Sequence, residues 1–99
     1  MKIKSKFCKT GDMRFISHLD LMRLFQRSLR RANMPVIITE GFSPHLKISI
    51  KRALKLGLES DDEELDVYVK KSIEPDLFKD SLNKNLPVGV RIKNCTECQ

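Results

Sequence analysis

Residues 2–7 of the chain read Lys2-Ile3-Lys4-Ser5-Lys6-Phe7, with a lysine at every second position. Successive side chains of a β-strand point to opposite faces, so this alternation predicts a strand with one half-buried face and one basic face. Thr10-Gly11-Asp12 has the composition of a turn and is expected to follow the strand. A sheet built on this strand would carry helices on its apolar side and lysines on the other side.

A helix is predicted from Ser17, as its N-cap, to about Asn33, because Pro35 marks its end. Asp20 lies three residues after the cap, which is a weak variant of the capping box. At about 100° per residue, the apolar side chains of this segment fall on one side and three arginines on the other. The apolar side consists of Leu21, Met22, Phe25, Leu29 and Ala32, and the arginine stripe consists of Arg23, Arg27 and Arg30.

Three further segments, residues 46–51, 65–70 and 88–93, alternate with the period of a strand. The first of them again has lysines on the polar side, at Lys47 and Lys51. The acidic run at residues 59–64 is expected to be a solvated hairpin connection that leads into the second of these strands.

Residues 74–83 are predicted to form a second helix, because Pro75 is tolerated in a first helical turn. Residues 36–39 form a short extended run, and residues 41–45 form a loop that contains both glycine and proline. The second helix is expected to have an apolar side made of Leu77, Phe78 and Leu82.

The predicted order of elements is β-α-β-β-α-β once the short run is treated as an appendage, which is the order of the split βαβ or ferredoxin-like fold. The expected fold class is therefore α+β, with one antiparallel sheet and two helices on one face. A length of 99 residues with 40% hydrophobic and 32% charged residues suits one globular domain spanning residues 1–99.

Location and redox state follow from what the sequence lacks. No apolar run approaches the roughly 18–20 residues of a membrane helix, and residues 1–6 lack the apolar stretch of a signal peptide, so a cytoplasmic protein without membrane contact is expected.

Three cysteines, Cys8, Cys95 and Cys98, are an odd number and are expected to be reduced. Cys95 and Cys98 have the spacing of half a metal site, but tetrahedral zinc needs four ligands. No metal or cofactor is expected, and this pair is predicted to lie in a frayed C-terminal tail.

If both helices cover one face of the sheet, the alternate residues of all four strands share the other face. The net charge of +6 favours polyanionic partners, and the acidic residues are expected to lie away from this face, with Asp66 as its single acid. The alternative is that the lysines only keep exposed strands soluble and unpaired. An RNA-binding platform is predicted, with Tyr68 as its one stacking ring and with phosphate contacts from Lys2, Lys4, Lys6, Lys47, Lys51, Lys70, Arg91 and Lys93.

Two stretches of the sequence carry a family resemblance. They are residues 9–23 (KTGDMRFISHLDLMR), with Arg30-Arg31-Ala32 after them, and residues 40–49 (EGFSPHLKIS). Both resemble the radical-SAM-linked protein family, a domain of unknown function found fused to, or encoded beside, radical S-adenosylmethionine proteins. The resemblance implies an accessory role beside such a protein, and it implies that this chain is the N-terminal half of a longer family domain. It does not imply an iron–sulfur cluster, because the C-x-x-x-C-x-x-C signature is absent. Leu46 stands where the family usually has a proline.

The same two stretches contain a candidate polar pocket. The helix dipole at the first turn favours the neutral ring of His18, and Asp20 and Arg23 can pair along the helix. The alternative interpretation is structural, with Ser17 and Asp20 as cap residues. The candidate pocket consists of Ser17, His18, Asp20, Arg23, Glu40 and His45.

Three functional hypotheses remain open on the sequence. The leading hypothesis is a non-catalytic module that binds RNA or a partner enzyme acting on RNA. The first alternative is a metal-independent ribonuclease with His18, His45 and Asp20 as catalytic candidates, by analogy with ferredoxin-like CRISPR RNA-processing enzymes. The second alternative is a half-domain that binds a protein partner, although lysine is depleted at the cores of protein interfaces.

Overall fold

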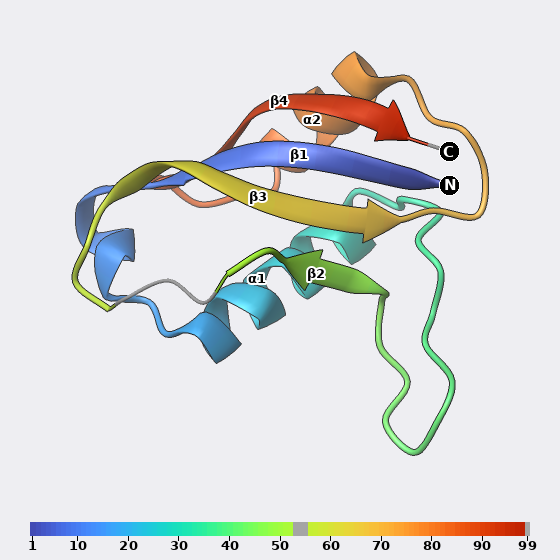
Figure 1. Cartoon of the computed structure of the whole chain (residues 1–99), viewed down its shortest axis with the longest axis horizontal. Helices are drawn as coiled ribbons and strands as arrows, with labels where there is room; N and C mark the ends of the chain where they lie inside the picture. The colour runs from blue at the N-terminus through green and yellow to red at the C-terminus, as the bar shows by residue number, and fades with distance from the viewer. Residues whose placement is uncertain (53–55, 99) are drawn as a thin grey trace.

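The computed structural model describes residues 1–52 and 56–98 of the chain. The four strands form one antiparallel sheet in the order β2-β3-β1-β4, and both helices lie on the same side of it (Figure 1). The predicted α+β class and ferredoxin-like arrangement are thereby confirmed. The elements in chain order are β1 (Lys2–Lys9), the 3-10 helix η1 (Gly11–Phe15), α1 (His18–Arg31), β2 (Ile48–Ile50), β3 (Ser60–Tyr68), α2 (Pro75–Asn83) and β4 (Val90–Cys98).

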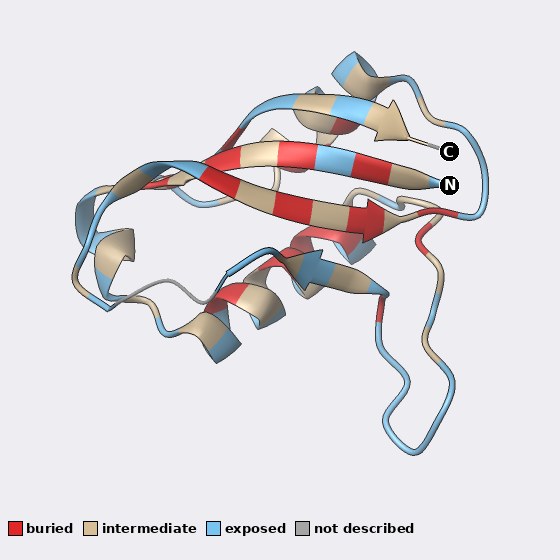
Figure 2. Cartoon of the chain, in the orientation of Figure 1, coloured by how far each residue is buried: buried red, intermediate tan, exposed pale blue. Residues whose placement is uncertain are grey.

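The core lies between the sheet and the helices, and it is built from the alternate residues of the strands. Ile3 and Phe7 of β1 are fully buried, and the rings of Phe7 and Phe25 meet edge to face with their centroids 5.1 Å apart. Figure 2 shows the same alternation of buried and more exposed residues along β1 and β3. Truncating a buried phenylalanine to alanine typically costs about 3–5 kcal/mol, which is a large fraction of the stability of a domain of this size.

Helix α1 begins where the sequence predicts, because the Oγ of Ser17 accepts the backbone N–H of Asp20 at 3.1 Å. The helix ends at Arg31, and Asn33 adopts a left-handed conformation with φ of 55°, which is common just after a helix C-terminus. The buried side consists of Leu21, Phe25, Ser28 and Leu29, Met22 and Ala32 are only partly buried, and Arg23, Arg27 and Arg30 are exposed together, as the helical period predicts.

Each helix is fixed to one edge of the sheet by a side-chain amide. Gln26 of α1 donates to the carbonyl of Leu46 at 2.8 Å and accepts the N–H of the same residue at 2.9 Å, just before the edge strand β2. Asn83 of α2 does the same with Ile92 of the other edge strand, β4, at 3.0 and 2.8 Å. These four hydrogen bonds satisfy backbone groups that no neighbouring strand reaches.

The short run at residues 36–39 is more than an appendage. Isolated antiparallel bridges join Val36 to Val69 and Ile38 to Leu46, and the N–H of Thr39 donates to the carbonyl of His45 at 2.7 Å. Residues 36–47 therefore form a hairpin that leads into β2, and its tip projects beyond the sheet in Figure 1. We call this segment the 36–47 hairpin.

The acidic run at residues 59–64 is not a hairpin connection, and that prediction is wrong. Strand β3 already begins at Ser60, so most of the run lies inside the sheet. Acidic residues are poor strand formers, but cross-strand pairs offset this preference. Here Glu64 lies opposite Lys6, and Glu63 faces the core side, where Arg52 binds it.

The prediction of the last strand is also wrong at both ends. Val88 is 98% exposed and precedes the strand, while β4 continues to Cys98, which pairs with Lys2, so residues 95–98 belong to the sheet and not to a frayed tail. At Gly89, where φ is 101°, an added Cβ would lie 2.7 Å from the carbonyl oxygen of Thr10, so the turn before β4 requires glycine. The pairing register shifts at Lys93, which reverses the alternation that marked the first half of the strand.

Two further expectations concern the helices. In α2, Phe78 and Leu82 are buried as predicted, but Leu77 is 57% exposed and does not belong to the apolar side. None of the helices in residues 1–52 and 56–98 is long and apolar enough to cross a membrane.

Candidate functional site

The outer face of the sheet, which points away from the helices, is the first candidate site. Lys2, Lys4 and Lys6 alternate with the buried residues of β1, as predicted, so they lie on this face. On the neighbouring strands they face Tyr68, Asp66 and Glu64 of β3, and Ser49 of β2 lies opposite Asp66. By the same alternation, the outer face also receives Lys47, Lys51, Asp62, Lys70, Arg91, Asn94 and Thr96.

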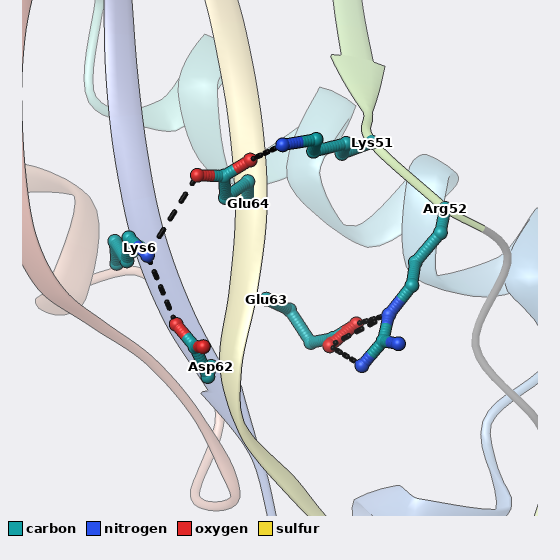
Figure 3. A pocket seen from close by; sticks show the side chains of 6 residues that line it. All are labelled: Lys6, Lys51, Arg52, Asp62, Glu63 and Glu64. Carbon is teal, nitrogen blue, oxygen red and sulfur yellow. Dashed lines mark hydrogen bonds and ion pairs between the residues drawn. The ribbon is translucent and has the colours of Figure 1, made fainter.

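One end of this face is a network of ion pairs, shown in Figure 3. It lines a shallow hollow of about 320 Å³. The carboxylate of Glu64 lies between Lys6 and Lys51, and Asp62 is a second partner of Lys6. We call this network the ion-pair end, and it consists of Lys6, Lys51, Asp62 and Glu64 on the outer face together with Arg52 and Glu63 beneath them.

The lysines of the ion-pair end are already neutralised by carboxylates. Lys6 Nζ lies 3.0 Å from Asp62 Oδ1 and 3.7 Å from Glu64 Oε1, and Lys51 Nζ lies 2.9 Å from Glu64 Oε2. The hydrogen bond with Asp62 raises the pKa of Lys6, and the same bond lowers the pKa of Asp62. The pKa of Glu64 is lowered mainly by its hydrogen bond from Lys51. A phosphate that binds here must displace a carboxylate.

Beneath these pairs, on the core side of the sheet, the buried side chain of Glu63 forms an ion pair with Arg52, whose side chain is 70% exposed. Arg52 donates to it through Nε and Nη2, both at 2.8 Å, and the hydroxyl of Ser60 adds a bond of 3.0 Å. Glu63 is only 1% exposed, and the hydrogen bonds from Arg52 lower the pKa of its carboxyl group. This pair ties the segment after β2 to β3, which is a structural role.

The expected charge count of the outer face is therefore wrong. The prediction placed Asp66 alone among the cations, but β3 also carries Asp62 and Glu64 on this face. Arg91 and Lys93 lie toward the ion-pair end as well, because Arg91 faces Cys8 and Lys93 Nζ donates to the carbonyl of Asp61 at 2.8 Å. The acids join the face because β3 starts earlier than the sequence pattern indicates.

The opposite end of the same face has an excess of positive charge. Lys47 Nζ lies 4.6 Å from the centroid of the Tyr68 ring, and Lys2 Nζ lies 6.0 Å from it. The one acid here, Asp66, is 3.8 Å from Lys2 Nζ, and its Oδ1 is buried without a hydrogen-bond partner within the described residues. We call this surface the tyrosine end, and it consists of Lys2, Lys4, Lys47, Asp66, Tyr68 and Lys70.

The residues of the predicted polar pocket divide into two groups. Ser17 caps α1, and Asp20 pairs with Arg23 at 3.5 Å on the exposed helix surface, as the structural interpretation predicts. Nδ1 of His18 is buried without a hydrogen-bond partner within the described residues. Glu40 lies exposed on the 36–47 hairpin, and Arg23 and His45 line one groove.

The two histidines of the ribonuclease alternative, His18 and His45, have different surroundings. Nδ1 of His45 lies 2.9 Å from the carbonyl of Ser43 and 3.3 Å from the hydroxyl of Thr39, so the turn of the hairpin holds the ring. In residues 1–52 and 56–98, no hydrogen bond or ion pair joins His45 to His18 or Asp20.

The cysteines do not form a joint metal site. Cys95 lies opposite Ser5 and Cys98 lies opposite Lys2, so the two thiols project from opposite faces of the sheet. Cys95 Sγ donates to the carbonyl of Pro75 at 3.1 Å, and burial raises the pKa of its thiol. Within the part of the chain that the structure describes, no group of three or more ligating side chains could hold a metal ion.

A groove between α1 and the 36–47 hairpin is a feature that the sequence analysis missed. Its volume is about 530 Å³. The sequence signal for it is weak, because the helical period places Met22 on the buried side of the helix and the sequence analysis gave Leu19 no role. The groove is lined by Leu19, Met22, Arg23, Gln26, Arg27, Arg30 and His45, and we call it the arginine groove.

Together, the fold and these surfaces define a small α+β module with an open, charged sheet. The chain belongs to a family described as uncharacterized protein conserved in bacteria (DUF2344), and the match covers residues 2–99. No curated protein and no solved structure matches the chain.

Proposed function

We propose that this chain is a non-catalytic accessory module that binds single-stranded RNA at the tyrosine end of the sheet. The observation that carries the proposal is the charge balance of this end, where four lysines share the surface with one carboxylate, Asp66. A cationic surface binds a polyanion by releasing the counterions condensed on it. The partly exposed ring of Tyr68 adds a stacking partner for one base.

The tyrosine end is a better phosphate site than the ion-pair end because its lysines are less engaged. Lys47 contacts the ring of Tyr68, and an exposed cation–π contact of this kind contributes only about 0.5–1 kcal/mol. Lys4 has no carboxylate within ion-pair distance among the described residues. With one ring and several cations, phosphate contact outweighs base reading, so weak sequence preference is expected.

The association with a radical S-adenosylmethionine protein is the second part of the proposal. It is supported by the sequence resemblance of residues 9–23 and 40–49, which lie on η1, α1 and the 36–47 hairpin. The expected result is that the chain co-elutes with a radical S-adenosylmethionine protein from the same bacterium in size-exclusion chromatography. Separate elution of the two purified proteins at micromolar concentration would remove this part.

The RNA proposal is tested by fluorescence anisotropy with a labelled RNA of roughly 12 nucleotides, titrated at several salt concentrations. Each phosphate contact contributes roughly 0.7 to the slope of log affinity against log salt. Lys4→Ala with Lys47→Ala should therefore weaken binding and flatten this slope by about 1.4.

The matched control is Lys51→Ala, which removes a lysine of the same face that Glu64 already neutralises. Its RNA affinity and salt slope should stay close to those of the wild type. Absent or salt-insensitive RNA binding by the wild type would contradict the proposal, and so would an equal loss in Lys51→Ala. An RNA-integrity gel of the same samples should show uncut RNA, whereas cleavage that His18→Ala abolishes would restore the ribonuclease alternative.

A further inference from the structure

The arginine groove is a surface with its own charge and shape, separate from the outer face of the sheet. Arg23, Arg27 and Arg30 follow one another along the exposed side of α1, over roughly 10 Å of helix. Leu19 and Met22 lie beside them and provide apolar surface, and Leu19 is 59% exposed. His45 of the 36–47 hairpin contributes the opposite wall.

The positive charge of this groove is largely uncompensated. Arg23 pairs with Asp20 at 3.5 Å, but both side chains are more than half exposed. Arg27 and Arg30 have no ion pair within residues 1–52 and 56–98. Three guanidinium groups therefore face one carboxylate, which selects an anionic partner.

The hairpin wall is held in place before any partner arrives. Gln26, which lies in the groove, forms two hydrogen bonds with the backbone of Leu46. His45, which directly precedes Leu46, donates its backbone N–H to the hydroxyl of Thr39 at 3.1 Å. A preformed groove loses less conformational entropy on binding than one that has to be assembled.

The apolar surface decides between two kinds of anionic partner. A nucleic-acid backbone would use the arginines but leave Leu19 and Met22 without a contact that excludes water. A peptide with acidic and apolar side chains would use both, since guanidinium groups bind carboxylates in bidentate geometry and methionine adapts to varied apolar side chains. Arginine is also enriched among the residues that dominate protein–protein affinity.

We propose that the arginine groove binds an acidic, amphipathic segment of a partner protein. The apolar side chains of that segment lie on Leu19 and Met22, and its carboxylates pair with Arg23, Arg27 and Arg30. The groove is in the helix layer, so a protein partner and an RNA at the tyrosine end occupy different surfaces. This inference stands independently of the RNA proposal.

The probe for the test is a labelled synthetic peptide of roughly 14 residues, with leucine at every third or fourth position and glutamate at most others, whose binding is followed by anisotropy. The same peptide with glutamine in place of glutamate, or alanine in place of leucine, should each bind at least about tenfold more weakly. In NMR spectra of the whole chain, the peptide should shift the methyl signals of Leu19 and Met22 and the amide signals of the 36–47 hairpin.

Two charge-matched double variants separate this site from the RNA site. Arg27→Glu with Arg30→Glu should weaken the peptide by roughly tenfold or more and change RNA affinity far less. Lys70→Glu with Lys71→Glu, which makes the same change in net charge at two exposed positions, should weaken RNA and leave the peptide nearly unaffected.

Three results would overturn the inference. One is that the wild type fails to bind the acidic peptide or binds the glutamine peptide equally well. Another is that the arginine variant loses RNA binding and keeps peptide binding, which would assign the groove to nucleic acid. The last is that sedimentation shows wild-type self-association that the arginine variant abolishes, which would make a second copy of the chain the occupant.

Discussion

The two ends of the outer sheet face contain lysines on the same strands and differ in what neutralises them. At the ion-pair end, Lys6 and Lys51 hydrogen-bond to carboxylates on β3. At the tyrosine end, Lys47 lies over the ring of Tyr68. The difference comes from β3, which places Asp62 and Glu64 at the ion-pair end and Tyr68, its last residue, at the tyrosine end. The number of lysines on a sheet face is therefore a poor measure of its affinity for anions, since cross-strand partners decide which lysines remain available.

The largest expected effect comes from removing the ring of the tyrosine end. Tyr68→Leu keeps an apolar side chain on β3 but removes base stacking, which contributes about 1–3 kcal/mol per base. RNA affinity should fall by roughly thirtyfold, with little change in the salt slope, because no phosphate contact is lost. Anisotropy titrations measure both quantities, and thermal unfolding serves as the control for folding. A Kd within about twofold of the wild type would show that the ring does not contact RNA.

A smaller effect, of opposite sign, is expected when the ion-pair end is made to resemble the tyrosine end. Asp62→Asn with Glu64→Gln removes the carboxylates that hold Lys6 and Lys51. Two additional phosphate contacts should strengthen RNA binding about fivefold at low salt and steepen the salt slope by about 1.4. The same titrations test this, and an unchanged slope would mean that RNA never reaches this end of the face.

The smallest effect concerns acid stability, which the ion-pair end should dominate. Hydrogen bonds from Lys6, Arg52 and Lys51 lower the pKa values of Asp62, Glu63 and Glu64 in the folded chain. Their stabilisation is therefore present above the unfolded pKa values of about 4 and is lost as the pH falls through the lower folded values. The urea midpoint should decrease between about pH 5 and pH 3, and it should decrease less in the Asp62→Asn, Glu64→Gln double variant. Equal decreases in both proteins would place the acid-sensitive groups elsewhere.

Most of the fold could be predicted from the sequence because its signals are local. The alternation in β1 and the capping pattern at Ser17 are each contained in a few residues, and the structure confirms them. The arginine stripe of α1 follows from the helical period in the same way. Local patterns of this kind are informative because each element has to bury one face.

The features that the sequence analysis missed depend on partners from distant segments. The acidic start of β3 is stable because Lys6, on another strand, and Arg52, beyond β2, bind it. The second half of β4 lacked a readable pattern because the register shift at Lys93 interrupts the alternation. The arginine groove exists because Gln26 holds the hairpin beside α1, and no local pattern reports such a contact.

The amide pairs at the two sheet edges have a consequence for self-association through strands. An edge strand exposes backbone N–H and C=O groups that can pair with a strand from another molecule, which is how aggregation often begins. Gln26 occupies both groups of Leu46, and Asn83 occupies both groups of Ile92, so each edge is blocked at one position from within. Substitution of either amide would free these backbone groups to pair with other copies of the chain. The variant would then form fibres on storage while its fold was still intact.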